Sequence, residues 1–233
     1  MCTVTFLPKG SQSFILTSNR DETPARAAMP PVGYEVFGKT LFFPKDPLAG
    51  GTWIVTDRER FTLCLLNGAF EAHKRTPPYR ISRGQMVLEF FKHADVDEFL
   101  SSYDFQGIEP FTLVLIDSLE ETQVTELIWD GEKPHIKKLD PTKAYIWSSA
   151  TLYPKAIAEQ RASWFSQWLD DHEAYEQADI IGFHKYGGQG DLWNDFVMKR
   201  GDNLQTVSIT SISKEEQYSM VYEDLLKAEI SNN

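Results

Sequence analysis

The feature that most constrains the fold is a series of short apolar segments separated by tight polar turns. In the first third of the chain, Thr3–Pro8 and Ser13–Ser18 are predicted strands, joined by the turn Lys9–Gln12. Thr52–Thr56 and Phe61–Leu66 are a second such pair. Strands of this length that are joined by short turns pair as antiparallel hairpins, so the chain is expected to build antiparallel sheet.

Two short helices are predicted after these hairpins. Ser82 and Gln85 give a capping-box pattern before a helix over Met86–His93, and Asp95 with Glu98 repeats the pattern. Further strands are predicted at Phe111–Ile116, Gln123–Trp129, Ala144–Trp147, Val207–Ser211 and Tyr218–Tyr222.

The longest predicted helix begins at Pro154 and ends near Tyr175, and the glycine-rich segment Gly182–Asn203 is predicted to be a long loop. Antiparallel strands with helices between groups of them indicate an α+β fold. No repeat or low-complexity linker marks a boundary, so residues 1–233 are expected to form a single domain.

Composition excludes several partners. The chain carries 34 acidic and 23 basic residues, a net charge of −11, which repels nucleic acid and anionic lipid. No segment approaches the roughly 18 apolar residues of a membrane span, and no signal peptide is recognisable. Two cysteines make no disulfide framework, so a cytoplasmic location is expected.

No metal site or cofactor is predicted. The five histidines lack the spacing of a zinc site, and the glycines of Tyr186–Gly190 lack the spacing of a phosphate-binding loop. Cys64 lies within an apolar strand and is expected to be an inert buried thiol.

Cys2 is the first candidate catalytic residue. Removal of Met1 would leave Cys2 with a free α-amine, whose ordinary pKa is about 7.7–8.0, beside a thiol of pKa about 8.5. One residue would then carry both a nucleophile and a base. The alternative is that Cys2 is a small apolar start to a strand.

The first hairpin brings polar residues towards Cys2. If its turn is centred just after Gly10, paired positions sum to about 21, which puts Cys2 opposite Asn19 and beside Arg20 and Asp21. A guanidinium lowers the pKa of a nearby thiol and can bind a carboxylate, and an aspartate can hold the α-amine. The alternative is a polar strand end that carries a surface ion pair.

The second hairpin has a similar polar end. Its predicted register brings Asn67 opposite Gly50 or Gly51, where the amide could stabilise an oxyanion. The alternative is ordinary turn chemistry, because Asn67 precedes Gly68.

The segments MCTVTF, SNRDE and GGTW occur in the order and spacing of the NRDE family, also called the transport and Golgi organisation family. The strand end at Asn67, the pair Arg83–Gly84, the strand FTLVLID and the segment Trp147–Ala150 fit that family as well. The resemblance covers about Met1 to Leu169.

That family resembles choloylglycine-type N-terminal-nucleophile hydrolases, which cleave the carbon–nitrogen bond of linear amides. The resemblance implies a four-layer αββα sandwich of two antiparallel sheets. It also implies that Cys2 is the nucleophile, that Arg20 and Asp21 line its pocket, and that Asn67 stabilises the oxyanion.

Asn19, Ser148, Ser149 and Arg200 are the predicted substrate-binding residues. Family members usually carry Ser-Asn where this chain has Ser148–Ser149, so Ser149 replaces an amide that would sit in the active site. Arg200 is the candidate for the late arginine of choloylglycine hydrolases.

Two functions follow from these residues. The first is an N-terminal-cysteine amidohydrolase that acts on a small or amphipathic ligand with a carboxylate or amide. The second is a binding or transfer protein for haem or acyl lipids on the same scaffold. Ser149 favours binding, and the set Cys2, Arg20 and Asp21 favours catalysis. The sequence does not indicate an oligomeric state.

Overall fold

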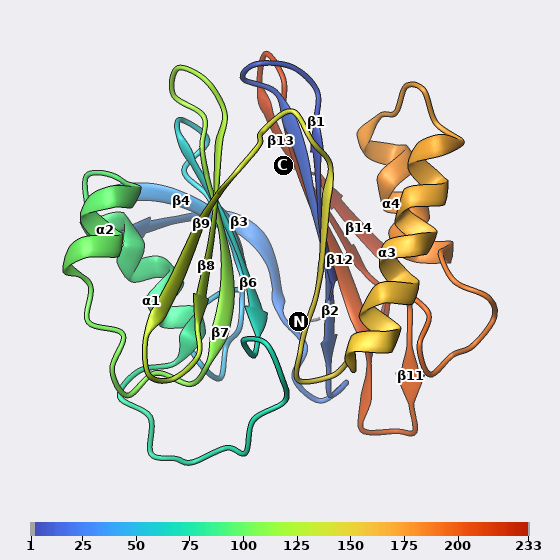
Figure 1. Cartoon of the computed structure of the whole chain (residues 1–233), viewed down its shortest axis with the longest axis horizontal. Coiled ribbons are helices and arrows are strands. Elements are labelled where there is room, and N and C mark those ends of the chain that lie inside the picture. The colour runs from blue at the N-terminus through green and yellow to red at the C-terminus, as the bar shows by residue number, and fades with distance from the viewer. Residues whose placement is uncertain (1–2, 233) are drawn as a thin grey trace.

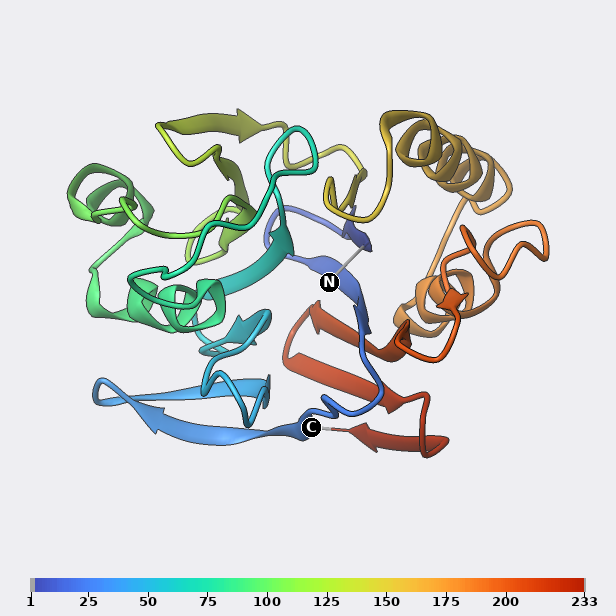
Figure 2. The same ribbon diagram turned by 90° about the horizontal axis from the view of Figure 1, so that it is seen from below.

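The computed structural model describes residues 3–232 and has four layers (Figure 1). Two antiparallel sheets face each other in the middle, two short helices cover one outer face, and two longer helices cover the other. Figure 2 shows the same layers from below. The predicted α+β fold with an αββα arrangement is confirmed.

Each sheet has seven described strands. Sheet A contains, in spatial order, β10 (Tyr145–Ser148), β1 (Thr3–Pro8), β2 (Phe14–Glu22), β12 (Leu204–Lys214), β13 (Tyr218–Asp224) and β14 (Glu229–Asn232), with β11 (Lys199–Arg200) paired to β12. Sheet B contains β3 (Met29–Val36), β4 (Lys39–Lys45), β5 (Ile54–Thr56), β6 (Phe61–Asn67), β7 (Phe111–Asp117), β8 (Gln123–Trp129) and β9 (Pro134–Leu139).

The helices on sheet B are α1 (Arg83–Glu89), the 3-10 turn η1 (Phe90–Lys92) and α2 (Val96–Ser102). Both predicted caps are confirmed. The Ser82 hydroxyl accepts from the Gln85 N–H at 3.2 Å, and the Asp95 carboxylate accepts from the Glu98 N–H at 2.8 Å. Each bond satisfies an otherwise unpaired amide of the first helical turn.

The helices on sheet A are α3 (Lys155–Asp170) and α4 (Gln177–Tyr186). The prediction for this region was partly wrong, since the long helix ends before Tyr175 and a second helix occupies part of the predicted loop 182–203. Ile180 and Phe183 bury their side chains with Phe165 and Phe196 in the layer between sheet A and these helices. That burial stabilises α4 despite its glycine and weak local pattern.

The β1–β2 hairpin is offset by one residue from the predicted register. Pro8 pairs with Phe14 and Thr3 pairs with Asn19, because Lys9 and Ser13 close a five-residue connection through a 2.8 Å backbone hydrogen bond. The prediction that Cys2 lies opposite Asn19 is therefore wrong. Cys2 itself lies outside the described residues.

Alternation along these strands separates two environments. Val4, Phe6 and Leu16 pack between the two sheets, where they form a core with Ile54 and Leu66. The intervening residues of β1 and β2 face α3 and α4. Successive side chains of a strand point to opposite faces, so neighbouring polar residues at the end of β2 serve different layers of the molecule.

Candidate active site

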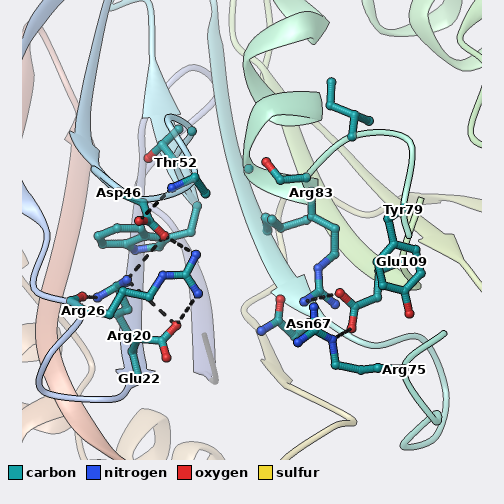
Figure 3. A pocket seen from close by; sticks show the side chains of 17 residues that line it. Arg20, Glu22, Arg26, Asp46, Thr52, Asn67, Arg75, Tyr79, Arg83 and Glu109 are labelled. Atoms are coloured by element: carbon teal, nitrogen blue, oxygen red, sulfur yellow. Dashed lines mark hydrogen bonds and ion pairs between the residues drawn. The ribbon is translucent and has the colours of Figure 1, made fainter. Parts of the chain in front are cut away.

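A cavity of about 340 Å³ opens where β2 of sheet A and β6 of sheet B end (Figure 3). Its lining combines polar residues from both sheets, the β4–β5 connection, the start of α1 and the segment before that helix. The polar and aromatic lining residues are Arg20, Glu22, Arg26, Asp46, Thr52, Trp53, Asn67, Arg75, Tyr79, Ser82, Arg83 and Glu109.

One side of the cavity, which we call the Arg20 wall, consists of Arg20, Glu22, Arg26 and Asp46 (Figure 3). A nitrogen of Arg20 lies 3.7 Å from the Asp46 carboxylate and 4.0 Å from that of Glu22. Arg26 lies closer to both carboxylates, at 2.6 Å from Asp46 and 3.1 Å from Glu22. Two arginines thus face two carboxylates, and the wall is balanced in charge.

Arg20 is the buried member of this wall, with 3% of the residue exposed. Its guanidinium lies 4.8 Å from the centre of the Trp53 ring and donates to the Arg26 carbonyl at 2.7 Å. Burial lowers the pKa of Arg20 from its ordinary value, and the nearby carboxylates of Glu22 and Asp46 oppose that shift. An arginine remains protonated under such conditions, so it supplies a fixed positive charge.

The opposite side, which we call the Glu109 wall, consists of Arg75, Arg83 and Glu109 (Figure 3). Arg83 reaches one oxygen of Glu109 at 3.3 Å, and Arg75 reaches the other at 3.2 Å. His73 also contacts the second oxygen, at 3.1 Å. Burial lowers the pKa of Arg83, while the charge of Glu109 opposes the shift. Asn67, at the end of β6, lies beside this group in Figure 3.

Two glycines let these elements approach one another. A Cβ on Gly51 would lie 2.3 Å from the carbonyl carbon of Gly84, and one on Gly84 would lie 2.9 Å from the Thr52 carbonyl oxygen. The Thr52 N–H donates to the Gly84 carbonyl across this contact at 3.1 Å. The GGTW and Arg83–Gly84 segments therefore meet at the cavity, and each requires glycine for close backbone approach.

Of the predicted site residues, Arg20 and Asn67 line the cavity, while Asn19 and Asp21 lie on the other face of β2. Asp21 accepts hydrogen bonds from the Tyr153 hydroxyl at 2.7 Å and from the Thr206 hydroxyl at 2.6 Å. Arg20 and Asp21 therefore point to opposite faces of β2, because strand alternation separates consecutive residues, and the role of Asp21 beside Cys2 stays a prediction.

Asn19 belongs to a buried network with His184 of α4. The Asn19 amide nitrogen donates to the carbonyls of His184 and Phe196 at 3.1 and 2.7 Å, which fixes the orientation of the amide. Its oxygen then faces His184 Nδ1, so that nitrogen carries the proton, and Nε2 accepts from the Thr5 hydroxyl at 2.8 Å. Burial lowers the pKa of His184 to about 3, which keeps the ring neutral.

Arg161 of α3 is a buried residue that the sequence analysis did not single out. Its guanidinium donates to the Thr3 hydroxyl and to the carbonyls of Asn194 and Asp195, and lies 3.6 Å from the centre of the Tyr153 ring. It therefore anchors the residue that follows Cys2 in the sequence. Arg161 falls on the apolar face of α3, four residues before Phe165, and a charged residue at such a position indicates a buried arginine.

Ser148, Ser149 and Arg200 are not among the lining residues of the cavity. Ser148 pairs with Thr3 at the end of β10. The Ser149 hydroxyl donates to the backbone carbonyl of Asn67 at 2.7 Å. Arg200 donates to the carbonyls of Leu152 and Trp193 at 3.0 and 2.9 Å, so these donors hold backbone segments and not a ligand in the cavity.

Within residues 3–232, no group of three or more His, Cys, Asp or Glu side chains is arranged to hold a metal ion. No described helix has the length and apolar character needed to cross a membrane.

The arrangement of layers is that of the N-terminal-nucleophile hydrolase fold. The fold matches the Caenorhabditis elegans N-acylethanolamine-hydrolyzing acid amidase ortholog, with a TM-score of 0.53, 12% identity, and coverage of 91% of this chain and 92% of that one. Penicillin V acylase from Agrobacterium tumefaciens gives a TM-score of 0.56 at 12% identity, over 100% of this chain and 85% of that one. A C2A variant of conjugated bile acid hydrolase from Clostridium perfringens gives 0.59 at 9% identity, over 100% and 92%.

The family model for Transport and Golgi organisation 2 matches residues 1–219. The chain belongs to that family, which the sequence resemblance had indicated. At the level of sequence, no curated protein matches it.

Proposed function

We propose that the chain is a cysteine amidohydrolase that cleaves a linear amide of a small or amphipathic molecule. The observation that carries the proposal is the cavity at the ends of β2 and β6. Thr3, which follows Cys2 in the sequence, pairs with Asn19, and the next residue, Arg20, lines that cavity together with Asn67. The similar structures are amidases and acylases, which supports the same reaction class.

In the proposed reaction, removal of Met1 frees the α-amine of Cys2. The amine takes the thiol proton, and the sulfur attacks the amide carbonyl to form a tetrahedral oxyanion. The Asn67 amide and a backbone N–H stabilise that charge. The carbon–nitrogen bond then breaks, and the leaving amine takes the proton from the α-ammonium. Water hydrolyses the thioester, which releases the acid and restores the thiol.

The surroundings of Asn67 suit this role. Its backbone carbonyl is held by Ser149, and β6 pairs with β7 up to the contact of Asn67 with Phe111. The backbone is therefore fixed while the side chain lines the cavity. A donor on a fixed backbone stabilises a developing charge without having to reorganise during the reaction.

A ligand carrier is the second candidate, and the placement of Ser149 favours it. The hydroxyl that replaces the usual amide is directed to the Asn67 carbonyl and to Thr151, at 2.7 and 2.9 Å, and Ser149 does not line the cavity. The described lining residues include no His, Cys or Met, so Tyr79 is the one side chain among them of a kind that ligates haem iron.

Two measurements test the proposal. The intact mass should show that Met1 is absent. A panel of N-acyl amides should then yield an acid and an amine, Cys2→Ala should abolish turnover, and Cys64→Ala should keep it. Retention of Met1, or equal turnover by the Cys2→Ala protein, would contradict the amidase mechanism. Undiminished ligand binding by a protein that turns over no amide would support the carrier.

A further inference from the structure

The two walls of the cavity differ in their balance of charge. In the Arg20 wall, Glu22 and Asp46 offset Arg20 and Arg26. In the Glu109 wall, Arg75 and Arg83 share the single carboxylate of Glu109. The side of the cavity that faces away from β2 therefore carries an excess of one positive charge.

The contacts of Glu109 show how this wall holds a carboxylate. One oxygen accepts from Arg75 Nε and contacts His73, while the other lies 3.3 Å from a terminal nitrogen of Arg83. A guanidinium has five N–H donors in a planar fork that matches a carboxylate. Arg83 uses one terminal nitrogen on Glu109 and donates from the other to the Pro110 carbonyl at 3.0 Å. Each nitrogen carries a second donor, because each terminal nitrogen has two hydrogens.

The two arginines differ in exposure in a way that suits binding. The Arg83 side chain is 15% exposed and is anchored by Glu109 and Pro110, whereas the Arg75 side chain is 71% exposed. Arg83 is thus the anchored and largely buried charge of this wall, and Arg75 is its solvent-exposed charge. The charge of Glu109 only partly offsets the cost of burying the Arg83 guanidinium, since the pKa of Arg83 stays lowered. A second anion beside Arg83 would therefore be attracted by its positive charge.

We propose that the Glu109 wall is a binding site for one terminal carboxylate of the ligand, with Arg83 as its anchor and Arg75 as its second contact. An excess of one positive charge matches a monoanion better than a phosphate, which carries about 1.5 to 2 negative charges. The orientation of the ligand rests on the proposed function, because an amide that is cleaved by Cys2 has to face the cysteine side of the cavity while the carboxylate contacts Arg83. It makes the preferred substrate an amide that bears a single carboxylate.

The experiment measures binding by isothermal titration to the Cys2→Ala protein, which separates recognition from turnover. The probes are N-octanoylglycine, the uncharged N-octanoylglycinamide and N-octanoylethanolamine phosphate. The carboxylate probe should bind at least about tenfold more tightly than the carboxamide, as expected for charge-assisted hydrogen bonds. Arg83→Met should reduce that preference to about threefold or less, and Arg75→Met should reduce it by a smaller factor.

Two variants serve as controls. Lys74→Met removes one positive charge from the same segment, yet Lys74 does not line the cavity, so the preference should remain. Arg83→Lys keeps the positive charge but not the planar fork of donors, so it should keep part of the preference for the carboxylate probe. It takes the place of Arg83→Met if a thermal melt shows that Arg83→Met folds poorly.

Equal affinity for the carboxylate and carboxamide probes, or no binding of either, would overturn the site. Tighter binding of the phosphate probe would overturn the choice of a carboxylate. Equal losses in Lys74→Met and Arg83→Met would show a general effect of charge and would also overturn it. Turnover is measured separately on protein with Cys2 intact, so a failed amidase assay with a preserved carboxylate preference rejects the reaction alone.

Discussion

The hydroxyl of Ser149 donates a 2.7 Å hydrogen bond to the backbone carbonyl of Asn67, and this bond joins the two sheets beside the cavity. Ser149 directly follows β10 of sheet A, and Asn67 ends β6 of sheet B. The residue that departs from the family pattern therefore holds the backbone of the predicted oxyanion residue. Ser149 therefore acts on the site by holding the Asn67 backbone in place and not by lining the cavity.

Ser149→Ala should lower the free energy of unfolding by about 1 kcal/mol, because the partly buried Asn67 carbonyl loses its hydroxyl partner. Chemical denaturation measures the loss. Ser101→Ala is the matched control, because the exposed Ser101 hydroxyl bonds to the Glu98 carbonyl within its own helix, and the change should alter stability by less than about 0.5 kcal/mol. Similar losses in the two variants would show that the bond between the sheets has no special weight.

Gly51→Ala should destabilise the protein by about 2 kcal/mol or more, because the new Cβ would meet the Gly84 backbone at 2.3 Å. Backbone atoms of two elements cannot move apart without opening the cavity. Gly182→Ala is the control, since a Cβ there meets no atom within 4 Å and a helical alanine is favoured. The melting temperature of Gly51→Ala should fall while that of Gly182→Ala stays level or rises.

His184 should make stability depend on pH. Its pKa is about 3 in the folded chain and 6.5 when unfolded, so between these values the unfolded state binds more protons. Stability therefore increases with pH across this window and falls by on the order of 4 kcal/mol as pH drops towards 3. Denaturation of the wild type and of His184→Gln at a series of pH values measures the difference, in which the shared carboxylates cancel. Parallel curves for the two proteins would contradict the assignment.

Cys2 should react with iodoacetamide faster than Cys64. Burial raises the pKa of Cys64 to about 12, and the residue is completely buried, so almost no accessible thiolate exists there at neutral pH. Peptide mapping after a brief exposure measures both sites, with denatured protein as the control in which both should be labelled. Preferential labelling of Cys64 in the folded protein would contradict the prediction.

Features set by neighbouring residues were predictable from the sequence. The hairpins and the Ser82 and Asp95 caps depend on contacts within a few positions, and the structure confirms them. The burial of Cys64 follows from its apolar strand. Family membership was also predictable from short segments. In GGTW, for example, Gly51 has to be a glycine because a Cβ there would meet the Gly84 backbone. The catalytic role of Cys2 stays a prediction.

Features set by distant contacts were decided by the tertiary structure. A one-residue difference in the turn changed the partner of Asn19, and strand alternation separated Arg20 from Asp21. The helix α4 depends on burial against sheet A, which its local pattern does not reveal. The Glu109 wall joins Arg75 and Arg83 to a residue more than twenty positions away. The sequence by itself determined most of the elements and the family. The arrangement of charges around the cavity required the packing of both sheets, because the interaction of two side chains depends on their separation in space and not on their separation along the chain.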